Sequence, residues 1–299
     1  MTARHSMIRA LRIQRLSIKE DSMPETGGSD DGGTRQAPVE INTNVAQSAR
    51  VYDYWLGGKD NFPADQVVAE AIVEQVPTIR TQVREQRAFL RRTVQYLTRE
   101  AGIRQFLDIG TGIPSAGNVH NVAQEVAPEA RVLYVDNDPI VLAHARALRP
   151  GSPEGRVSYI QADLREPEAI LGHPAVAKTL DLTQPVGLVL IGIMHHLRDE
   201  DDPRRILATL VDALVSGSYL VLSQTTPDFD PEAMRGLAAA SEQGGIANVP
   251  RTFADTEPFF TGLELVEPGL VPILAWRPDA GETRDPRSVY VYGGVARKP

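Results

Sequence analysis

The stretch Phe106-Leu-Asp-Ile-Gly-Thr-Gly-Ile-Pro114 decides the fold of this chain. Its first four residues are apolar except for one acid, a pattern typical of a short buried strand that ends at a polar edge. Gly110 and Gly112 follow at once, and glycines at such a turn let the backbone approach a ligand where a Cβ atom would not fit. A helix is expected next, over 118–126. The stretch therefore indicates the first strand–turn–helix unit of a nucleotide-binding α/β fold.

Two further predicted strands also end in acids. The strand over 131–135 runs into Asp136, and the strand over 157–160 is followed by Asp163. The carboxyl ends of parallel strands meet at one edge of a sheet, and ligands bind there in open α/β folds. We therefore expect Asp108, Asp136 and Asp163 to face a common site.

Strands and helices alternate through the rest of the chain. An apolar run over 187–191 has the composition of a strand buried on both faces, and a further strand is expected over 219–222. Two closing strands are expected over 263–266 and 289–292. No repeat is visible, so we predict a single α/β domain over residues 41–299.

The region before the first strand is predicted to have two parts. Residues 1–40 include a segment rich in Gly, Ser, Asp, Glu, Thr and Pro and are expected to be a disordered extension. Three helices are expected over 41–102, the first of them capped by Asn42 or Thr43. They precede the sheet in sequence, so they should lie over it or form a lid at its ligand-binding end.

Composition limits the function. The chain has 299 residues, 42% of them hydrophobic, a formal net charge of -8 and no cysteine. The missing cysteines exclude disulfides and thiolate chemistry, and the acidic balance argues against a duplex nucleic-acid binder. No apolar run reaches transmembrane length, so membrane association is not expected and a cytoplasmic protein is predicted. Because of the acidic charge balance, no nucleic-acid partner is expected either. Arginine greatly outnumbers lysine, which we interpret as the codon bias of a GC-rich bacterial genome.

The acids indicate which ligand the site would bind. Asp108 would repel a pyrophosphate, whereas it suits a ligand with cationic groups and no phosphate, such as S-adenosylmethionine. Asp136 would accept the ribose hydroxyls, and we group the adjacent Asn137 with it. Asp163 would accept from the adenine amino group while Leu164 packs on the ring. The alternative is that Asp136 and Asp163 merely cap the helices that follow them.

An aromatic segment in the first predicted helix, Tyr52-Asp-Tyr-Trp55, offers a partner for a sulfonium cation. A cation–π contact contributes about 0.5 to 2 kcal/mol. Gly58, one of two adjacent glycines after this segment, would let the backbone close over the ligand. The alternative is that Tyr52 and Trp55 belong to the core of an N-terminal helix.

Two segments carry a family resemblance. Asp108-Ile-Gly-Thr-Gly-Ile-Pro-Ser-Ala-Gly-Asn-Val-His120, with acids after the next two strands, resembles class I S-adenosylmethionine-dependent methyltransferases. Together with Ala49-Arg-Val-Tyr-Asp-Tyr-Trp-Leu-Gly-Gly-Lys-Asp-Asn-Phe62, it is similar to a largely actinobacterial family known as S-adenosyl methyltransferases, whose substrates are mostly unassigned. The resemblance covers about residues 41 to 299. It implies a Rossmann-like, seven-stranded, mostly parallel sheet with the last strand antiparallel, and S-adenosylmethionine as the cofactor. Pro114 replaces the third loop glycine.

His195 is the candidate catalytic residue. It follows the fourth predicted strand, at the edge where the methyl group should face the acceptor, so its imidazole could take a proton from an attacking group. The alternative is a packing or hydrogen-bonding role, because methyl transfer requires little beyond alignment. Adjacent residues diverge, so His195 and His196 do not suggest a metal site, and none is expected.

The sequence thus predicts an S-adenosylmethionine-dependent methyltransferase that acts on a small-molecule metabolite by in-line transfer. One alternative is an NAD(P)-dependent oxidoreductase on a related fold, which Asp108 disfavours, as does Ser115 at the third glycine position of a dinucleotide motif. The other is a non-catalytic regulator that binds S-adenosylmethionine.

Overall fold

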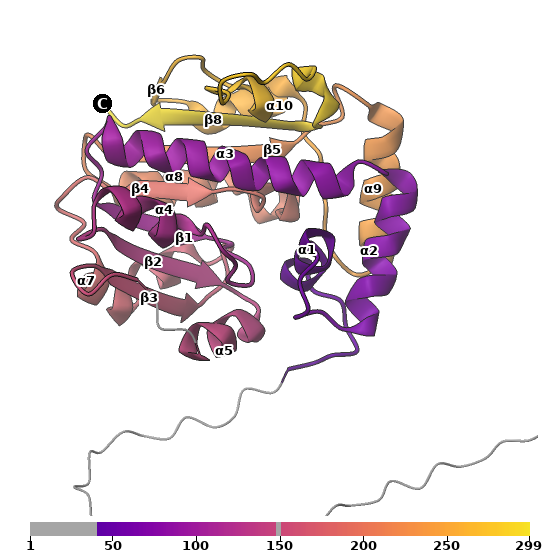
Figure 1. The fold of residues 1–299 in the computed structure, drawn as a ribbon, viewed down its shortest axis with the longest axis horizontal. Coiled ribbons are helices and arrows are strands. Elements are labelled where there is room, and N and C mark those ends of the chain that lie inside the picture. The colour runs from indigo at the N-terminus through magenta and orange to yellow at the C-terminus, as the bar shows by residue number, and fades with distance from the viewer. Residues whose placement is uncertain (1–40, 148–150) are drawn as a thin grey trace, which may run out of the picture. The chain divides into compact units, whose positions relative to one another are not determined.

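The computed structural model describes residues 41–147 and 151–299 and shows a central sheet with helices on both faces (Figure 1). The predicted disordered extension, residues 1–40, lies outside the described residues. The strands are β1 Gln105–Ile109, β2 Arg131–Asp136, β3 Arg156–Gln161, β4 Gly187–Leu190, β5 Tyr219–Thr225, β6 Glu264–Leu265, β7 Val271–Pro272 and β8 Val291–Arg297.

The sheet has the order β3-β2-β1-β4-β5-β8-β6, with β7 also paired to β8. Strands β1 to β5 are parallel, and β8 runs antiparallel to β5, β6 and β7. The mostly parallel sheet with an antiparallel last strand is thereby confirmed, and the two-residue β7 adds an eighth strand to the seven expected. The strand order reverses between β1 and β4, and such a switch point opens a crevice at the carboxyl edge.

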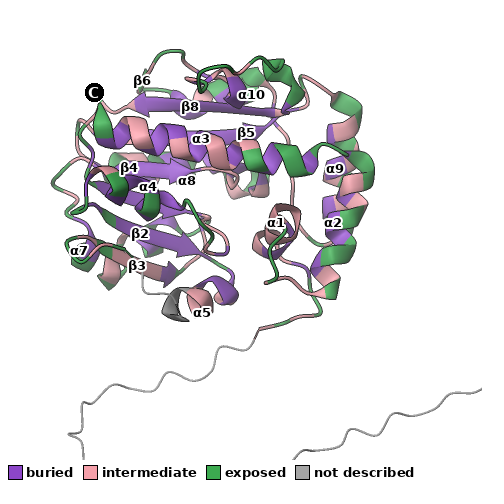
Figure 2. Cartoon of the chain, in the orientation of Figure 1, coloured by how far each residue is buried: buried purple, intermediate pink, exposed green. Residues whose placement is uncertain are grey.

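Helices cover both faces of the sheet and its carboxyl edge. The α-helices are α1 Ser48–Leu56, α2 Pro63–Gln75, α3 Ile79–Arg99, α4 Val119–Val126, α5 Pro139–Ala147, α6 Pro167–Leu171, α7 Pro174–Thr179, α8 Pro203–Asp212, α9 Pro231–Gln243 and α10 Phe253–Thr256. The 3-10 helices are η1 Met194–His196, η2 Asp199–Asp201, η3 Glu257–Phe260, η4 Ile273–Ala275 and η5 Pro286–Ser288. Alternate residues of each strand point to opposite faces. Phe106 packs with residues of α3 and α4, whereas Leu107 packs with residues of α6, α7 and α8. The central strands are buried, as Figure 2 shows.

Helix α3 packs against the sheet and joins it to the C-terminal region. Its Phe89 is fully buried and meets Trp276 edge to face, with ring centroids 5.7 Å apart. Arg92 is also buried, because its guanidinium donates to the carbonyls of Trp276 (3.0 Å) and Ile273 (2.7 Å). Arg92 is therefore a core residue although it carries a charge.

Of the three helices that precede the sheet, α3 lies over one face, whereas α1 and α2 lie at the carboxyl edge (Figure 1). Helix α2 packs against α9, with Val68 and Leu237 in one buried cluster. Helix α1 begins at Ser48 rather than at Asn42 or Thr43, because the carboxylate of Asp65 accepts the N–H of Gln47 at 2.9 Å. None of the helices within 41–147 and 151–299 is long and apolar enough to cross a membrane.

Candidate active site

A cavity of about 380 Å³ lies at the carboxyl edge of the sheet, under α1. Residues from β1 and β2, together with the loops that follow β1, β2, β3 and β4, form one side of it. The cavity brings together eight of the predicted site residues: Tyr52, Asp108, Gly110, Gly112, Asp136, Asn137, Asp163 and Leu164. Gly58 and His195 are not among the residues that line it.

The turn after β1 needs both of its glycines, for different reasons. Gly110 has φ 76°, and a Cβ atom there would lie 2.6 Å from the side chain of Ile193. Gly112 has φ 68° with open space around it, so only its backbone conformation requires glycine. Its N–H donates to Asp136 at 2.8 Å, which fixes the turn against the end of β2.

Asp136 joins two loops at the edge of the cavity. One of its oxygens accepts the N–H of Gly112 and the other accepts the N–H of Asp138 at 2.9 Å. Burial raises its pKa to about 6, although these backbone donors lower it. The acid at the start of α5 is instead Asp138, whose carboxylate accepts the N–H of Ile140 at 3.0 Å. The helix-capping alternative for Asp136 therefore does not hold.

Asp108 lies beside Arg87, a residue of α3 that also lines the cavity. Burial raises the pKa of Asp108 to about 7, while the Arg87 guanidinium and the Thr111 side chain lower it. Arg87 donates to Asn118 Oδ1 at 2.6 Å and to the carbonyl of Ala116 at 3.3 Å, so it is held over the turn after β1. Arg87 could not be predicted as a site residue, because nothing in the sequence distinguishes it from the other arginines of α3.

The end of β3 contributes an acid that has two roles. Asp163 lines the cavity, and its Oδ1 also accepts from the backbone N–H (2.9 Å) and the Nε (3.0 Å) of Arg165. Asn137 donates to its other oxygen at 3.4 Å. Asp163 thus stabilises its own turn and still faces the cavity. Leu164 beside it is buried and supplies an apolar wall.

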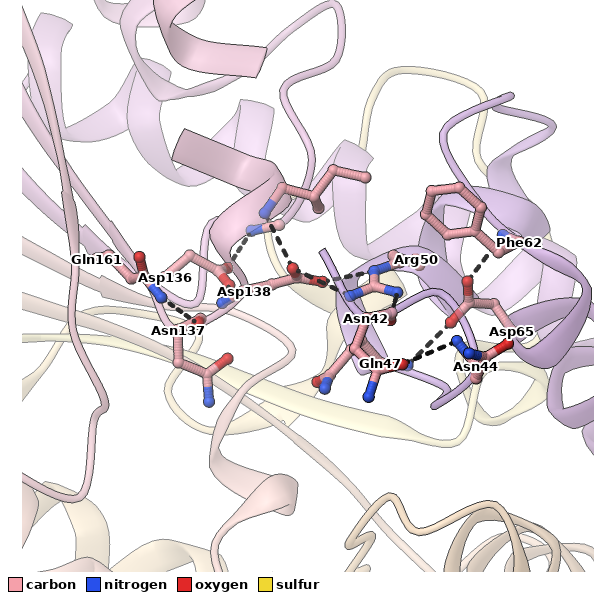
Figure 3. A network of polar contacts seen from close by, with 12 residues as sticks. Asn42, Asn44, Gln47, Arg50, Phe62, Asp65, Asp136, Asn137, Asp138 and Gln161 are labelled. Carbon is pink, nitrogen blue, oxygen red and sulfur yellow. Dashed lines mark hydrogen bonds and ion pairs between the residues drawn. The ribbon is translucent and has the colours of Figure 1, made fainter. Parts of the chain in front are cut away.

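Helix α1 is fastened to the loop after β2 (Figure 3). Arg50 donates through Nε to Asp138 at 2.9 Å and through Nη1 to the carbonyl of Asn42 at 2.9 Å. Asp65 accepts from the backbone N–H groups of Gln47 and Phe62. These contacts hold α1 and the segment before it across the cavity.

Two predicted residues of the N-terminal segment have different surroundings. Tyr52 lines the cavity, donates its hydroxyl to the carbonyl of Val83 at 3.0 Å and has a pKa raised to about 12 by burial. Gly58 is exposed, and a Cβ atom there would lie 1.9 Å from the carboxylate of Asp53. Contact with Asp53, rather than with a ligand in the cavity, therefore accounts for this glycine.

His195 lines a second, smaller cavity of about 50 Å³. Five residues line both cavities and form their common boundary: Ser48, Tyr52, Gly192, His196 and Ile246. Burial holds the pKa of His195 well below its usual range, so its imidazole is neutral. His196 makes a hydrogen bond from its ring to the carbonyl of Ala247 at 2.7 Å. Within the described ranges, no three His, Asp or Glu residues are arranged to hold a metal ion.

Residues 34–299 match the model of the S-adenosyl methyltransferase family. A DUF574 family protein from Streptomyces avermitilis is 47% identical, with a TM-score of 0.84 over 87% of this chain and 100% of that chain. A crystal structure from Thermobifida fusca is 40% identical, with a TM-score of 0.80 over 85% of this chain and 96% of that chain. A search of functionally curated proteins found no match.

A distant structure shares the fold alone. The plantazolicin methyltransferase BamL, solved with a triazolic desmethylPZN analog and S-adenosylhomocysteine, is 12% identical, with a TM-score of 0.50 over 84% of this chain and 95% of that chain. The family match does not favour the oxidoreductase alternative. The chain belongs to the S-adenosyl methyltransferase family, and it is an S-adenosylmethionine-dependent enzyme of the Rossmann-like methyltransferase fold.

Proposed function

We propose that the larger cavity binds S-adenosylmethionine and that the chain directs its methyl group to a small-molecule acceptor by in-line displacement. One observation carries this proposal. The strand order β3-β2-β1-β4 lines up Asp163, Asp136, Asp108 and Gly192 along the edge of the sheet. The polar groups of the cavity therefore follow one another in a row, as an extended ligand requires.

The residues present fit this cofactor chemically. Asp163 and Leu164 would hold the adenine at the β3 end, and Asp136 would accept the ribose hydroxyls, with Asn137 beside it. At the β1 end, an acid and an arginine are neighbours, as an amino-acid group with one ammonium and one carboxylate requires. Asp108 would hold the ammonium, and Arg87 would hold the carboxylate.

The sulfonium and methyl group of S-adenosylmethionine would lie at the boundary between the two cavities. Gly192 follows β4, next to β1 in the sheet, and Tyr52 covers this point from α1. The Tyr52 ring supplies an aromatic face for a sulfonium cation, worth about 0.5 to 2 kcal/mol. When bound, S-adenosylmethionine supplies an electrophilic methyl group and a neutral thioether leaving group. Alignment by these residues is the main catalytic contribution that such a displacement needs.

The position of α1 over the carboxyl edge of the sheet favours a small acceptor. Helix α1 and its preceding segment lie across the cavity and are fixed by the Arg50–Asp138 ion pair. We propose that the helices over 41–102 act as a lid that admits a compact acceptor and excludes water. Access for a nucleic-acid chain would require this buried ion pair to open.

Binding and turnover test the proposal separately. Calorimetry should show binding of S-adenosylhomocysteine and none of NAD, because Asp108 near the end of β1 would repel a pyrophosphate. Methyl transfer from radiolabelled S-adenosylmethionine to hydroxyl, amine and carboxyl metabolites then tests catalysis. Binding of NAD alone would refute the methyltransferase assignment. A protein that binds the cofactor with no turnover on any acceptor would favour the regulator alternative.

A further inference from the structure

The smaller cavity is surrounded by buried polar atoms that lack hydrogen-bond partners among the described residues. Such atoms are rare in native proteins, because an unpaired buried donor or acceptor costs free energy. Gln86, His195 and Thr225 are only 5%, 7% and 6% exposed. Each of these residues contributes one unpaired atom, and so does Asn248, which also lines the cavity. The four atoms are Gln86 Oε1, His195 Nδ1, Thr225 Oγ1 and Asn248 Oδ1.

The types of these atoms indicate what would satisfy them. Gln86 Oε1 and Asn248 Oδ1 are carbonyl oxygens, which only accept hydrogen bonds. A molecule that completes both must therefore present at least two donors. Thr225 Oγ1 can donate or accept, and His195 Nδ1 accepts when the imidazole hydrogen is on Nε2.

The rest of the lining excludes charge. The apolar part of the wall comes from α1, α2, α3 and α9 and includes Val51, Trp55, Ile72, Val83 and Leu237. The described residues that line the cavity include no Asp, Glu, Lys or Arg, so an ammonium or carboxylate group here would be buried without a partner. The cavity therefore favours hydroxyl compounds over aliphatic amines and carboxylic acids.

The cavity lies where an acceptor would have to bind. It meets the larger cavity at Gly192, after β4, and extends to Thr225, at the end of the adjacent β5. Gln86 lies next to Gly192, since a Cβ atom at Gly192 would lie 2.8 Å from Gln86 Oε1. With a volume of about 50 Å³, the cavity encloses one edge of a molecule rather than the whole of it.

We propose that the smaller cavity holds the methyl acceptor, and that this acceptor is an uncharged hydroxyl compound with at least two O–H groups on an apolar body. The inference rests on the proposed function of the larger cavity. The acceptor oxygen attacks the methyl carbon, the carbon–sulfur bond breaks and its electron pair stays on sulfur. The hydroxyl proton passes to His195 Nδ1 and, because burial lowers the pKa of this imidazole, moves on to solvent. A methyl ether, S-adenosylhomocysteine and a proton result.

Three probes of similar size test the inference on the full chain saturated with S-adenosylhomocysteine. Catechol is neutral with two adjacent hydroxyls, benzylamine is a cation and benzoate is an anion. Calorimetry should show catechol binding at least about tenfold tighter than either charged probe. Equal or tighter binding of a charged probe, or no binding of catechol to the saturated protein, would overturn the inference. If S-adenosylhomocysteine itself does not bind, the proposed function fails, and the inference fails with it.

Two variants test whether catechol binds in the smaller cavity. Gln86→Leu and Thr225→Val remove unpaired polar atoms with little change of shape, so each should leave Tm unchanged or raise it. Each should also weaken catechol binding by about tenfold or more while S-adenosylhomocysteine binding is retained. The matched control is Tyr159→Phe, which removes an unpaired buried hydroxyl outside both cavities and should leave catechol binding unchanged. A lower Tm with unchanged catechol binding would show that water satisfies these atoms, and would overturn the inference.

Discussion

Arg50 and Asp138 form a buried ion pair between residues 88 positions apart in the sequence. The pair connects α1 to the loop after β2, since Asp138 also donates its N–H to Asp136. Both side chains are almost fully buried, at 2% and 1% exposure. The helix over the cavity and the acid proposed to hold the ribose therefore belong to one connected network.

The first prediction concerns this ion pair. Arg50→Met should lower the free energy of unfolding by about 3 to 5 kcal/mol, because it leaves a buried carboxylate without its partner. It should also weaken S-adenosylhomocysteine binding. Urea unfolding and calorimetry measure the two effects. Arg80→Met is the matched control, since the Arg80–Glu70 pair is about half exposed and should contribute no more than about 1 kcal/mol. Equal losses in the two variants would contradict the role given to Arg50.

The second prediction concerns Asp136. Asp136→Ala should weaken cofactor binding by about 1.5 to 3 kcal/mol, the range expected when a hydrogen bond to a charged group is lost. Calorimetry with S-adenosylhomocysteine checks this value. Asp212→Ala, an exposed acid on α8 outside both cavities, should leave binding unchanged. Unchanged affinity in a folded Asp136→Ala protein would show that Asp136 only connects the two loops.

The third prediction concerns pH. The pKa of Asp108 is raised to about 7 in the free protein, from an unfolded value of 3.8. A raised carboxyl pKa means that the folded state favours the protonated form, so this group's contribution to stability declines as pH rises from about 4 to about 7. A cationic ligand favours the ionised form. Cofactor binding should therefore release protons below about pH 7 and strengthen as pH rises through that value.

Calorimetry in buffers of different ionisation enthalpy counts these protons. Asp108→Asn should remove most of the proton release and bind S-adenosylmethionine more weakly at pH 8. Asp136, with its pKa raised to about 6, should still release protons at lower pH in that variant. Binding that is independent of pH in the unmodified protein would rule out an ionised Asp108 beside the ligand.

The sequence was sufficient for features that depend on local pattern. The strand, acid and glycine turn around Asp108 could be predicted because a buried strand and a positive-φ turn each require particular residue types. The parallel sheet then follows from strand–helix alternation, and it carries Asp136 and Asp163 to the same edge.

Features that depend on distant contacts could not be predicted. Helix α1 begins at Ser48 because Asp65, from the next helix, accepts the N–H of Gln47. Gly58 resembles a ligand-approach glycine in sequence, yet the close atom in the structure is the carboxylate of Asp53. His195 follows β4 as expected, but it lines a separate small cavity together with residues of α1 and α9.

The last prediction concerns Arg87, which only the structure identifies. If its guanidinium holds the cofactor carboxylate, Arg87→Met should weaken S-adenosylmethionine binding by about 1.5 to 3 kcal/mol, as for a charged hydrogen bond. Decarboxylated S-adenosylmethionine, which lacks that carboxylate, is the matched ligand and should bind the unmodified protein and the variant with nearly equal affinity. Calorimetry with both ligands separates this role from a structural one. Equal losses for the two ligands would mean that Arg87 acts by holding the turn through Asn118 and Ala116.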